Sequence, residues 1–448
     1  MGTSLKYGLS SLLLGLTIGL GYAVEQSDFP YIISMYALFF VAYIFIYKKA
    51  TRQDGWFFIG LGIVLRASLL FGIPNLSDDI YRFVWDGRLL LNGINPFDHL
   101  PSYYIEQATM PEGITQNLYD QLNSPNYFTI YPPVCQAVFA LSCWVFPHSI
   151  LGSAILMKLF VFACEVGSLL LLVRLLPPFR SQSEGPPPRE VLLYALNPLI
   201  IIELCGNLHF EGPMIFFLLL ALWCLQRQRY DWSAVAMALS IASKLLPLIF
   251  LPFLIQRLGW KKSLRYFIIV GALLLLFFLP LASGAFLANF GNSLDLYFRK
   301  FEFNASLYYL LRWVGFQLSG YNLIAFIGPG LALLVFINIL VKAWREQNPH
   351  LSSLPLMMLF AICLYLSCTT TVHPWYASLP IVLCLFTRFR FPVLWSGLIV
   401  LTYINYSYAE YFENLWIVGI EYGLVVLFFW MEYTGRLKNL TDSPALAD

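Results

Sequence analysis

Two adjacent aspartates, Asp78 and Asp79, begin the most polar stretch of an otherwise apolar chain. Hydrophobic residues make up 59% of the sequence and charged residues only 12%, so a dense group of ionisable side chains needs a physical reason. The run SDDIYRFVWDGRLLLNG reads as a helix whose first turn is capped by one of the two aspartates. The other carboxylate would then point off the helix start into a cavity, where partial burial strengthens a carboxylate as a base toward a hydroxyl group. The pair therefore predicts one general base and one helix cap.

The same predicted helix carries Arg82 and Asp86 four residues apart, a spacing that places both on one helix face. An ion pair along the helix and a contact with a substrate are equal alternatives for these two side chains. Tyr131 belongs to the YPP motif that ends the polar region. We treat it as a further candidate for substrate contact.

A second polar group lies in ELCGNLHFEG, between two apolar runs, where Gly206 and Gly212 allow a tight turn. The side chains of Asn207, His209 and Glu211 suit hydrogen bonds to sugar hydroxyls, and a polar turn without function is the alternative. A divalent metal held by His209 and Glu211 is the weaker interpretation. The eight cysteines fall mostly in apolar runs and show no metal-ligand spacing, so we expect no cofactor.

Lys244 stands in the apolar run ALSIASKLLPLIFLPF. A charge at membrane depth costs about 2.5–3.5 kcal/mol, so such a residue normally pairs with or binds something. As a compact cation it suits an anionic phosphate. The alternative is a lysine whose ammonium group extends to the membrane interface.

His373 precedes Pro374 in TTTVHPWYASLP, at the first turn of a predicted helix. Imidazole and backbone N–H groups can meet an anion at such a position, and a helix cap without function is the alternative. Tyr376 belongs to the same motif. Arg299 and Arg312, in FRKFEFNASLYYLLR, are candidates for additional positive charge around a phosphate.

Long apolar runs must position these residues. They approach or reach the roughly 20 residues that a helix needs to cross about 30 Å of hydrocarbon, and include 10–24, 31–47, 264–282, 323–341 and 415–431. Lipid offers the backbone no hydrogen-bond partners, and the runs are continuous instead of alternating, so helices are predicted and a barrel is excluded. We expect an all-α polytopic membrane protein with about fourteen transmembrane helices in a single domain, residues 1–448.

The charges between the runs predict the orientation. EQSDFP, after the first run, is acidic, whereas YKKATRQDG, after the second, carries three basic side chains. The positive-inside rule therefore places the N-terminus in the cytoplasm. The first run is expected to remain as a span, because residues 21–25 offer no convincing cleavage site for a signal peptide. Both termini are predicted to be cytoplasmic, with the candidate residues on the outer face.

Residues 74–149 form the first outer loop of this topology and are expected to contain amphipathic helices. Its last part, 131–146, can cross the membrane or lie flat along the interface, and the flat arrangement keeps the later basic loops inside. The other predicted segments are core helices at 150–282 with a half-length helix pair at 231–257, a second outer loop at 283–320, and C-terminal helices at 321–448. The half-length pair is expected to turn near Lys244, and broken helices of this kind usually line a cavity.

Several runs, taken in order, resemble the GT-C superfamily of integral-membrane glycosyltransferases: SDDIYRFVWDGRLLLNGINPF, YPP, NPLIIIELCGNLHFEGPMIFF, SKLLPLIFLP, FEFNASLYYLLR and HPWY. The sequence is similar in particular to bacterial polyprenyl-phosphate-mannose transferases and to the catalytic subunit of the first GPI mannosyltransferase. The resemblance implies an inverting transfer of a hexose, with mannose expected, from a polyprenyl-phosphate donor. It also implies a lipid-linked or glycan acceptor and an active site on the periplasmic face of a bacterial inner membrane.

The resemblance also assigns roles to individual residues. Asp79 matches the base of the family better than Asp78, which is the reserve candidate. Lys244 opens the Lys-x-x-Pro element of the family, and His373 is expected near the donor phosphate. Glu211 stands where relatives have an aspartate, and the spaced Asp-x-Asp of the eukaryotic enzyme is absent, so the sugar and the acceptor stay open.

Two other functions are compatible with these residues. A membrane transporter or lipid flippase also contains broken helices and buried charges. However, the sequence shows no inverted repeat, and its charged residues gather on one predicted face instead of on both sides of the midplane. The third alternative is a transferase that moves a preassembled glycan or phosphosugar.

Overall fold

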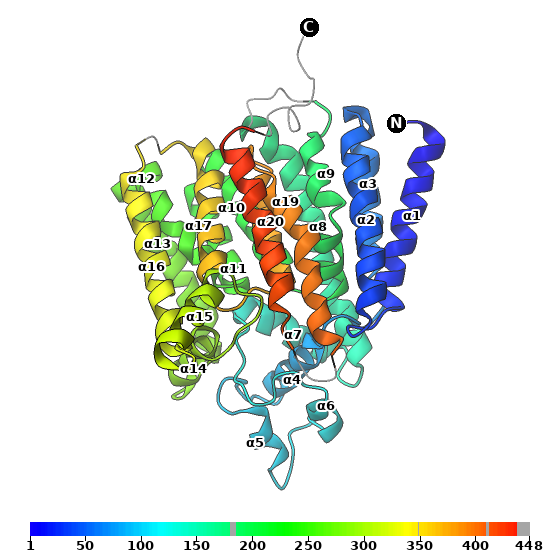
Figure 1. Cartoon of the computed structure of the whole chain (residues 1–448). Coiled ribbons are helices and arrows are strands. Elements are labelled where there is room, and N and C mark those ends of the chain that lie inside the picture. The colour runs from blue at the N-terminus through cyan, green and yellow to red at the C-terminus, as the bar shows by residue number, and fades with distance from the viewer. Residues whose placement is uncertain (180–184, 348, 409–411, 437–448) are drawn as a thin grey trace.

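The computed structural model of the protein describes residues 1–179, 185–347, 349–408 and 412–436. In these ranges the chain is helical, and the one extended pairing is a single parallel bridge between Phe303 and Thr371. This confirms the all-α prediction for the part of the chain that the structure describes. The long helices lie side by side as a bundle (Figure 1). Helices α4 (Asp79–Leu91) to α7 (Pro133–Val145) gather at one end, which we name the loop end, and the N-terminus lies at the opposite, terminal end.

The bundle begins with three helices and a short 3-10 turn: α1 (Thr3–Tyr22), α2 (Phe29–Lys49), η1 (Arg52–Asp54) and α3 (Gly55–Ala67). Asp54 connects these elements. Its Oδ1 accepts a hydrogen bond from Lys6 Nζ at 2.7 Å, and its Oδ2 accepts one from the Thr51 backbone N–H at 3.0 Å. The second contact is part of a capping box at the start of η1, in which Thr51 and Asp54 satisfy each other's backbone N–H groups.

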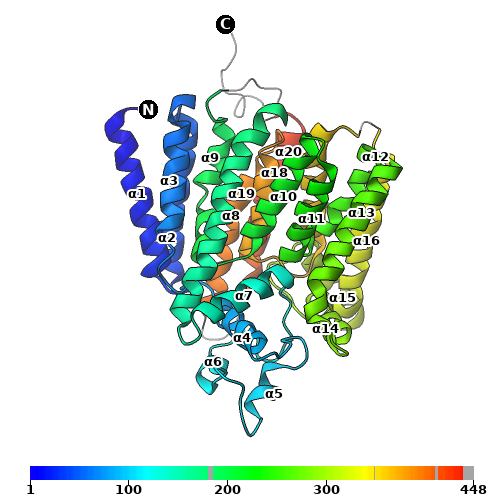
Figure 2. The same ribbon diagram turned by 180° about the vertical axis from the view of Figure 1, so that it is seen from behind.

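The predicted first outer loop forms four short helices at the loop end: α4, α5 (Pro101–Ile105), α6 (Gln116–Asp120) and α7. The rings of Phe83 on α4 and Phe139 on α7 stack at 4.5 Å, which holds these two helices together. Pro133 starts α7, as suits a residue with no backbone N–H to satisfy. Figure 2 shows α7 lying obliquely across the end of the bundle, and at 13 residues it is shorter than a span requires.

The middle of the chain alternates long helices with interrupted ones: α8 (Ile150–Phe179), η2 (Arg189–Val191), α9 (Leu192–Ala195), the π-helix η3 (Ile200–Gly206), α10 (Glu211–Gln226), α11 (Tyr230–Ser243), η4 (Leu246–Phe253), α12 (Leu254–Leu258), α13 (Trp260–Phe278) and η5 (Leu279–Leu281). Helix α11 ends where the sequence predicts a turn, because Lys244 has an extended backbone before η4 begins. Pro247, in the first turn of η4, has no N–H with which to continue α11.

Two serines join α10 and α11 across their interface. Ser233 Oγ donates to the Ala221 carbonyl at 2.9 Å, and Ser240 Oγ donates to the Met214 carbonyl at 2.7 Å. Small side chains such as Ala234 and serine allow the two backbones to approach closely, as is common between helices in membranes. The pair therefore forms a rigid hairpin whose open end lies toward Lys244.

The C-terminal part completes the bundle with α14 (Phe286–Arg299), α15 (Leu307–Ser319), α16 (Ile324–Arg345), η6 (Leu351–Ser353), α17 (Leu354–Cys368), η7 (Pro374–Ala377), α18 (Ser378–Cys384), α19 (Phe391–Leu398), η8 (Ile399–Tyr406) and α20 (Leu415–Tyr433). Helices α14 and α15, in the predicted second outer loop, lie at the loop end (Figure 1). Residues 437–448 of the predicted C-terminal segment lie outside the described ranges.

Six helices in the described ranges are long and apolar enough to cross a membrane: α2, α8, α13 with η5, α16, η6 with α17, and α20. A seventh is added if η3 and α10, which meet at a bend of 109°, count as one broken span. These helices indicate an integral membrane protein. The predicted number of about fourteen spans is not confirmed, because many helices of the bundle are too short to cross alone.

One buried ion pair links three helices in the bundle interior. Arg66 Nε on α3 donates to Glu165 Oε2 on α8 at 3.0 Å, and neither side chain is exposed. Glu165 Oε1 accepts a hydrogen bond from the Tyr194 hydroxyl at 2.7 Å. The remaining guanidinium nitrogens donate to the backbone carbonyls of Gly62, Tyr194 and Ala195. This network fixes α3, α8 and α9 relative to one another.

Candidate active site

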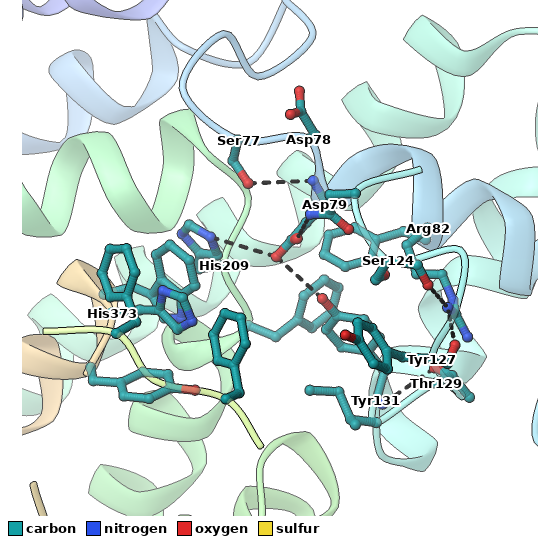
Figure 3. A pocket seen from close by; sticks show the side chains of 18 of the residues that line it. Ser77, Asp78, Asp79, Arg82, Ser124, Tyr127, Thr129, Tyr131, His209 and His373 are labelled. Carbon is teal, nitrogen blue, oxygen red and sulfur yellow. Dashed lines mark hydrogen bonds and ion pairs between the residues drawn. The ribbon is translucent and has the colours of Figure 1, made fainter. Parts of the chain in front are cut away.

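A cavity of about 350 Å³ opens at the loop end, among segments that are far apart in the sequence. Figure 3 shows many of its side chains. The lining residues are Gln26, 76–79, Arg82, Phe83, Asn123, Ser124, 127–131, His209, Phe210, Lys244, Phe301, Phe303, His373, Trp375, Tyr376 and Tyr406. Eight of the predicted site residues therefore line one pocket: Asp78, Asp79, Arg82, Tyr131, His209, Lys244, His373 and Tyr376.

Asp79 presents its carboxylate to the pocket. Its Oδ1 accepts a hydrogen bond from Asn123 Nδ2 at 2.7 Å, and its Oδ2 accepts one from the Tyr131 hydroxyl at 3.2 Å. The same Oδ2 lies 3.9 Å from His209 Nε2 (Figure 3). With 19% of the side chain exposed, the carboxylate is held in a fixed direction and remains open to a ligand.

Asp78 occupies a different position at the start of α4. It is the N-cap residue, but its side chain makes no capping hydrogen bond within the described structure. The Ser77 hydroxyl instead accepts a weak bond, 3.4 Å, from the Asp79 backbone N–H. The prediction that an aspartate side chain caps this helix is therefore wrong, because Asp78 turns away from the helix start (Figure 3). Partial burial and the nearby Asp79 carboxylate raise the pKa of Asp78.

Arg82 and Asp86 form the ion pair that their spacing allows, with Nε and Oδ1 2.9 Å apart. Both are buried, and each also contacts the segment that follows α6. Arg82 Nη1 donates to the backbone carbonyls of Ser124 and Tyr127, while Asp86 Oδ2 accepts from Thr129 Oγ1 at 2.5 Å. Asp86 lies outside the pocket lining. The pair thus fastens this segment, which carries Asn123 and Tyr131, against α4.

His209 lies at the break between η3 and α10. Its Nδ1 is 2.9 Å from the Glu203 backbone carbonyl oxygen, and its ring stacks on Trp375 at a centroid distance of 3.7 Å. Asn207, two residues earlier, is buried behind the pocket and donates to Glu203 Oε2 at 3.0 Å and to Tyr403 at 3.2 Å. Asn207 therefore supports the wall of the pocket and does not line it.

An aromatic stack forms the wall opposite Asp79. The Trp375 ring lies between the imidazoles of His209 and His373, and His373 stacks in turn on Phe303 at 4.7 Å. Burial, together with the positive charge of Lys244 and the nearby His209, lowers the pKa of His373 to about 3. His373 is therefore a neutral imidazole at physiological pH, and it remains the N-cap residue of η7 as predicted.

Lys244 places an ammonium group at the pocket. Its ammonium group pairs with Glu211, the first residue of α10, and lies 5.3 Å from the centre of the Tyr376 ring. Glu211 is fully buried and outside the pocket lining, so its carboxylate compensates Lys244 from behind. Glu211 Oε2 has no hydrogen-bond partner in the described ranges.

The structure does not bring Arg299 and Arg312 to the pocket lining. Arg299, on α14, pairs with Asp295 at 2.9 Å, and both side chains are about half exposed. Arg312, on α15, pairs with Glu302 and lies over the Tyr309 ring. Each arginine already has an acidic partner within its own segment, which a list of basic residues could not show. Among the described residues, no group of three or more His, Cys, Asp or Glu side chains is arranged to hold a metal ion.

Three residues near the site were not predicted from the sequence: Asn123, Glu203 and Trp375. Trp375 stands in the HPWY motif beside two candidates, so the motif contained a signal for it. Glu203 carries a charge within the apolar run NPLIIIELCG, which was also a usable signal. Asn123 lies in a polar segment without periodicity, and only the fold brings it to Asp79.

Comparison with known proteins places the chain in a family. A family described as "Alpha-(1->6)-mannopyranosyltransferase, N-terminal domain" matches residues 29–259, slightly more than half of the chain. The chain belongs to this family. The matched segment of this family member contains Asp79, His209 and Lys244, whereas His373 follows it.

Two relatives carry the same description, Alpha-(1->6)-mannopyranosyltransferase A. The protein of Mycobacterium tuberculosis is 26% identical over 205 residues, which are 45% of this chain and 37% of the relative. The protein of Corynebacterium glutamicum is 23% identical over 219 residues, 47% of this chain and 42% of the relative. The match thus spans about two fifths of the length of these relatives.

Proposed function

We propose that this family member transfers mannose from a polyprenyl-phosphate-linked donor to a hydroxyl group of a lipid-linked or glycan acceptor, with inversion at the anomeric carbon. The observation that carries the proposal is that the Asp79 carboxylate and the Lys244 ammonium group line one cavity. Such a transfer needs a base for the acceptor and a cation for the leaving phosphate. Membership of a mannosyltransferase family supports mannose as the sugar.

In this mechanism Asp79 is the general base. It removes the proton of the acceptor hydroxyl as that oxygen attacks the anomeric carbon of the sugar. The bond from the anomeric carbon to the phosphate oxygen breaks, and its electron pair leaves with the polyprenyl phosphate. Asn123 and Tyr131 each hold one carboxylate oxygen, so the base is oriented before the acceptor arrives.

Lys244, His373 and Tyr376 form the proposed phosphate side of the pocket. A phosphate oxygen can bind Lys244 from the pocket side while Glu211 stays behind it, since the Lys244 side chain is 23% exposed. The neutral imidazole of His373 would contribute a hydrogen bond to the phosphate instead of a second charge. Because Lys244 and the hydrogen bond from His373 stabilise the negative charge of the leaving phosphate, the proposed reaction needs no metal.

We further propose that the pocket faces the periplasm across a bacterial inner membrane. The basic side chains Lys48 and Lys49 end α2, and Lys342 and Arg345 end α16. Both helix ends lie at the terminal end, opposite the pocket (Figure 1). The positive-inside rule favours a cytoplasmic position for these charges and so an outer position for the loop end.

Transfer by the purified protein, reconstituted into vesicles, tests the proposal. The donors are polyprenyl phosphates carrying labelled mannose, glucose or arabinose, offered with a lipid-linked mannoside acceptor. We expect label from the mannose donor in the acceptor, with inverted configuration, and none when Asn replaces Asp79. Movement of labelled lipid between leaflets without sugar transfer would overturn the proposal in favour of a flippase.

A further inference from the structure

A buried carboxylate, Glu203, lies directly behind His209 and outside the pocket lining. Its Oε1 accepts a hydrogen bond from the Tyr403 hydroxyl at 2.9 Å, and its Oε2 accepts one from Asn207 Nδ2 at 3.0 Å. The same Oε2 is 3.3 Å from His209 Nδ1. Both oxygens of Glu203 are thus held in place, and one of them faces the imidazole.

The contacts of His209 determine which ring nitrogen carries the hydrogen. Nδ1 lies 2.9 Å from the backbone carbonyl oxygen of Glu203, and a carbonyl oxygen can only accept a hydrogen bond. Nδ1 therefore carries the hydrogen, and in the neutral ring Nε2 is an acceptor. Nε2 is buried, has no hydrogen-bond partner among the described residues and points toward Asp79 Oδ2, 3.9 Å away (Figure 3).

The backbone around His209 is unusual on both sides of this contact. Glu203 belongs to a π-helix, a rare form that is frequent at functional sites. Leu208 has a φ of 63°, in the left-handed region that a branched side chain rarely adopts. Strain of this kind persists only where the surrounding structure enforces it. Here it places the imidazole against Trp375, with Nδ1 toward Glu203 and Nε2 toward Asp79.

We propose that Glu203 is a positioning residue that holds His209 ready to take the proton which Asp79 removes from the acceptor. This inference rests on the proposed function. His209 Nε2 is the only ring position left to receive a proton. The charge that the ring then gains is stabilised by the Glu203 carboxylate beside Nδ1.

The proton balance is simple. The O–H bond of the acceptor breaks and its proton moves to Asp79 Oδ2, as the new glycosidic bond forms and polyprenyl phosphate leaves. The proton then passes from Asp79 to His209 Nε2 when the two atoms close by about 1 Å to hydrogen-bond distance. Asp79 is again a carboxylate, and the imidazolium later releases the proton to water in the pocket. No other reactant is consumed.

A pair of substitutions tests the relation between Glu203 and His209. We expect Glu203→Gln to lower kcat about 10- to 100-fold, as losing the partner behind a working imidazole commonly does, while the donor KM changes less than about twofold. His209→Gln should lower kcat at least as much. The double variant should be no slower than His209→Gln alone, because Glu203 acts through that ring. If kcat of the double variant fell by the product of the two single losses, the proposal would be overturned.

Glu421→Gln is the matched control. Glu421 is also buried, and its Oε1 accepts hydrogen bonds from Trp395 Nε1 at 2.7 Å and Asn304 Nδ2 at 3.2 Å, but it lies outside the pocket lining. Any loss that this variant shows should multiply with that of His209→Gln. If the variant that combines Glu421→Gln with His209→Gln were no slower than His209→Gln alone, the same result for Glu203→Gln would reflect general damage to the fold.

A second measurement does not depend on catalysis. Nitrogen-15 NMR of the five histidines, with the His209 signal assigned by its absence in His209→Gln, reports which ring nitrogen carries hydrogen. We expect hydrogen on Nδ1 in the wild type. Hydrogen should stay on Nδ1 in Glu203→Gln, because the backbone carbonyl of residue 203 is unchanged, but the Nδ1–H proton resonance should move upfield, because the carboxylate oxygen 3.3 Å from Nδ1 is gone. A wild-type Nε2–H ring, or an unchanged Nδ1–H resonance in the variant, would overturn the inference. If the wild type transferred no sugar, the proposed function would be wrong. The NMR measurement would still show whether Glu203 positions the His209 ring.

Discussion

Two groups of buried polar side chains in this protein differ in how completely they are paired. In the bundle interior, Arg66 donates to Glu165 and to three backbone carbonyls, and Glu165 accepts from Arg66 and Tyr194. At the pocket, by contrast, His209 Nε2, Glu211 Oε2 and His373 Nδ1 are buried without a hydrogen-bond partner in the described ranges. Both regions contain buried ionisable side chains, but only in the interior network do the polar atoms named here all have hydrogen-bond partners.

The difference suggests distinct roles for these two groups, and single unpartnered atoms elsewhere in the described ranges, such as Glu421 Oε2, do not surround this pocket. A buried polar atom without a partner costs about 1–3 kcal/mol, so natural folds rarely keep several close together. The cost is understandable if a ligand completes the missing hydrogen bonds. The incomplete group lies at a cavity lined by a carboxylate and an ammonium group, whereas the complete group lies outside the lining of that cavity. Substitutions in the two regions should therefore affect different properties.

The largest effect is expected at Asp79. Asp79→Asn keeps the size of the side chain but removes the base, and transfer should fall about 100- to 10,000-fold. Initial rates with the labelled mannose donor measure this. Folding should be preserved, so the midpoint of thermal unfolding should stay near that of the wild type. Full transfer by this variant would contradict the assignment of Asp79.

The next effect concerns stability. Glu165→Gln leaves Arg66 buried without its counter-charge, and the free energy of unfolding should drop by about 3–5 kcal/mol. Thermal unfolding in detergent, compared with Asp79→Asn under the same conditions, measures the loss. If both variants unfolded at the wild-type temperature, the interior pair would not be the structural charge that its geometry indicates.

A smaller effect is expected at Lys244. Lys244→Gln removes a charge-assisted contact worth about 1.5–3 kcal/mol, so the donor KM should rise about tenfold or more. Lys244→Arg, which keeps the charge, should recover part of the affinity. Lys262→Gln is the matched control, since Lys262 lies 4.7 Å from the centre of the Tyr230 ring, outside the pocket lining. Equal KM values for Lys244→Gln and Lys262→Gln would contradict a phosphate contact.

The smallest effect is expected at Asp78, whose pKa is raised above the ordinary value of 3.8. The folded state binds this proton more tightly than the unfolded chain does, so ionised Asp78 destabilises the fold at neutral pH. Asp78→Asn should therefore unfold at a slightly higher temperature than the wild type at pH 7. The difference should disappear as the pH falls through the raised pKa toward 3.8. Transfer should change less than about threefold, far less than for Asp79→Asn.

The class of fold followed from the sequence because lipid leaves a backbone few choices. Continuous apolar runs predict helices, and the described chain is helical. The number of spans did not follow, because composition cannot show which apolar segments are interrupted. The π-helix η3, the 109° bend after it and the extended residue Lys244 break runs that appear continuous in the sequence. Packing against neighbouring helices compensates for these breaks.

The candidate site followed from the sequence only in part. The cost of charge in an apolar chain selected Asp78, Asp79 and Lys244, whereas the polar turn around His209 and the helix start at His373 selected the two histidines; the fold brings all five to one pocket. The family resemblance favoured Asp79 over Asp78, but the physical difference between the two aspartates is visible only in the tertiary structure, in the contacts of Asp79 with residues more than forty positions away. The same applies to the arginines that pair within their own segments and to Glu203 behind His209. Residue type fixes what a side chain can do, whereas its direction and its partners depend on how distant segments pack.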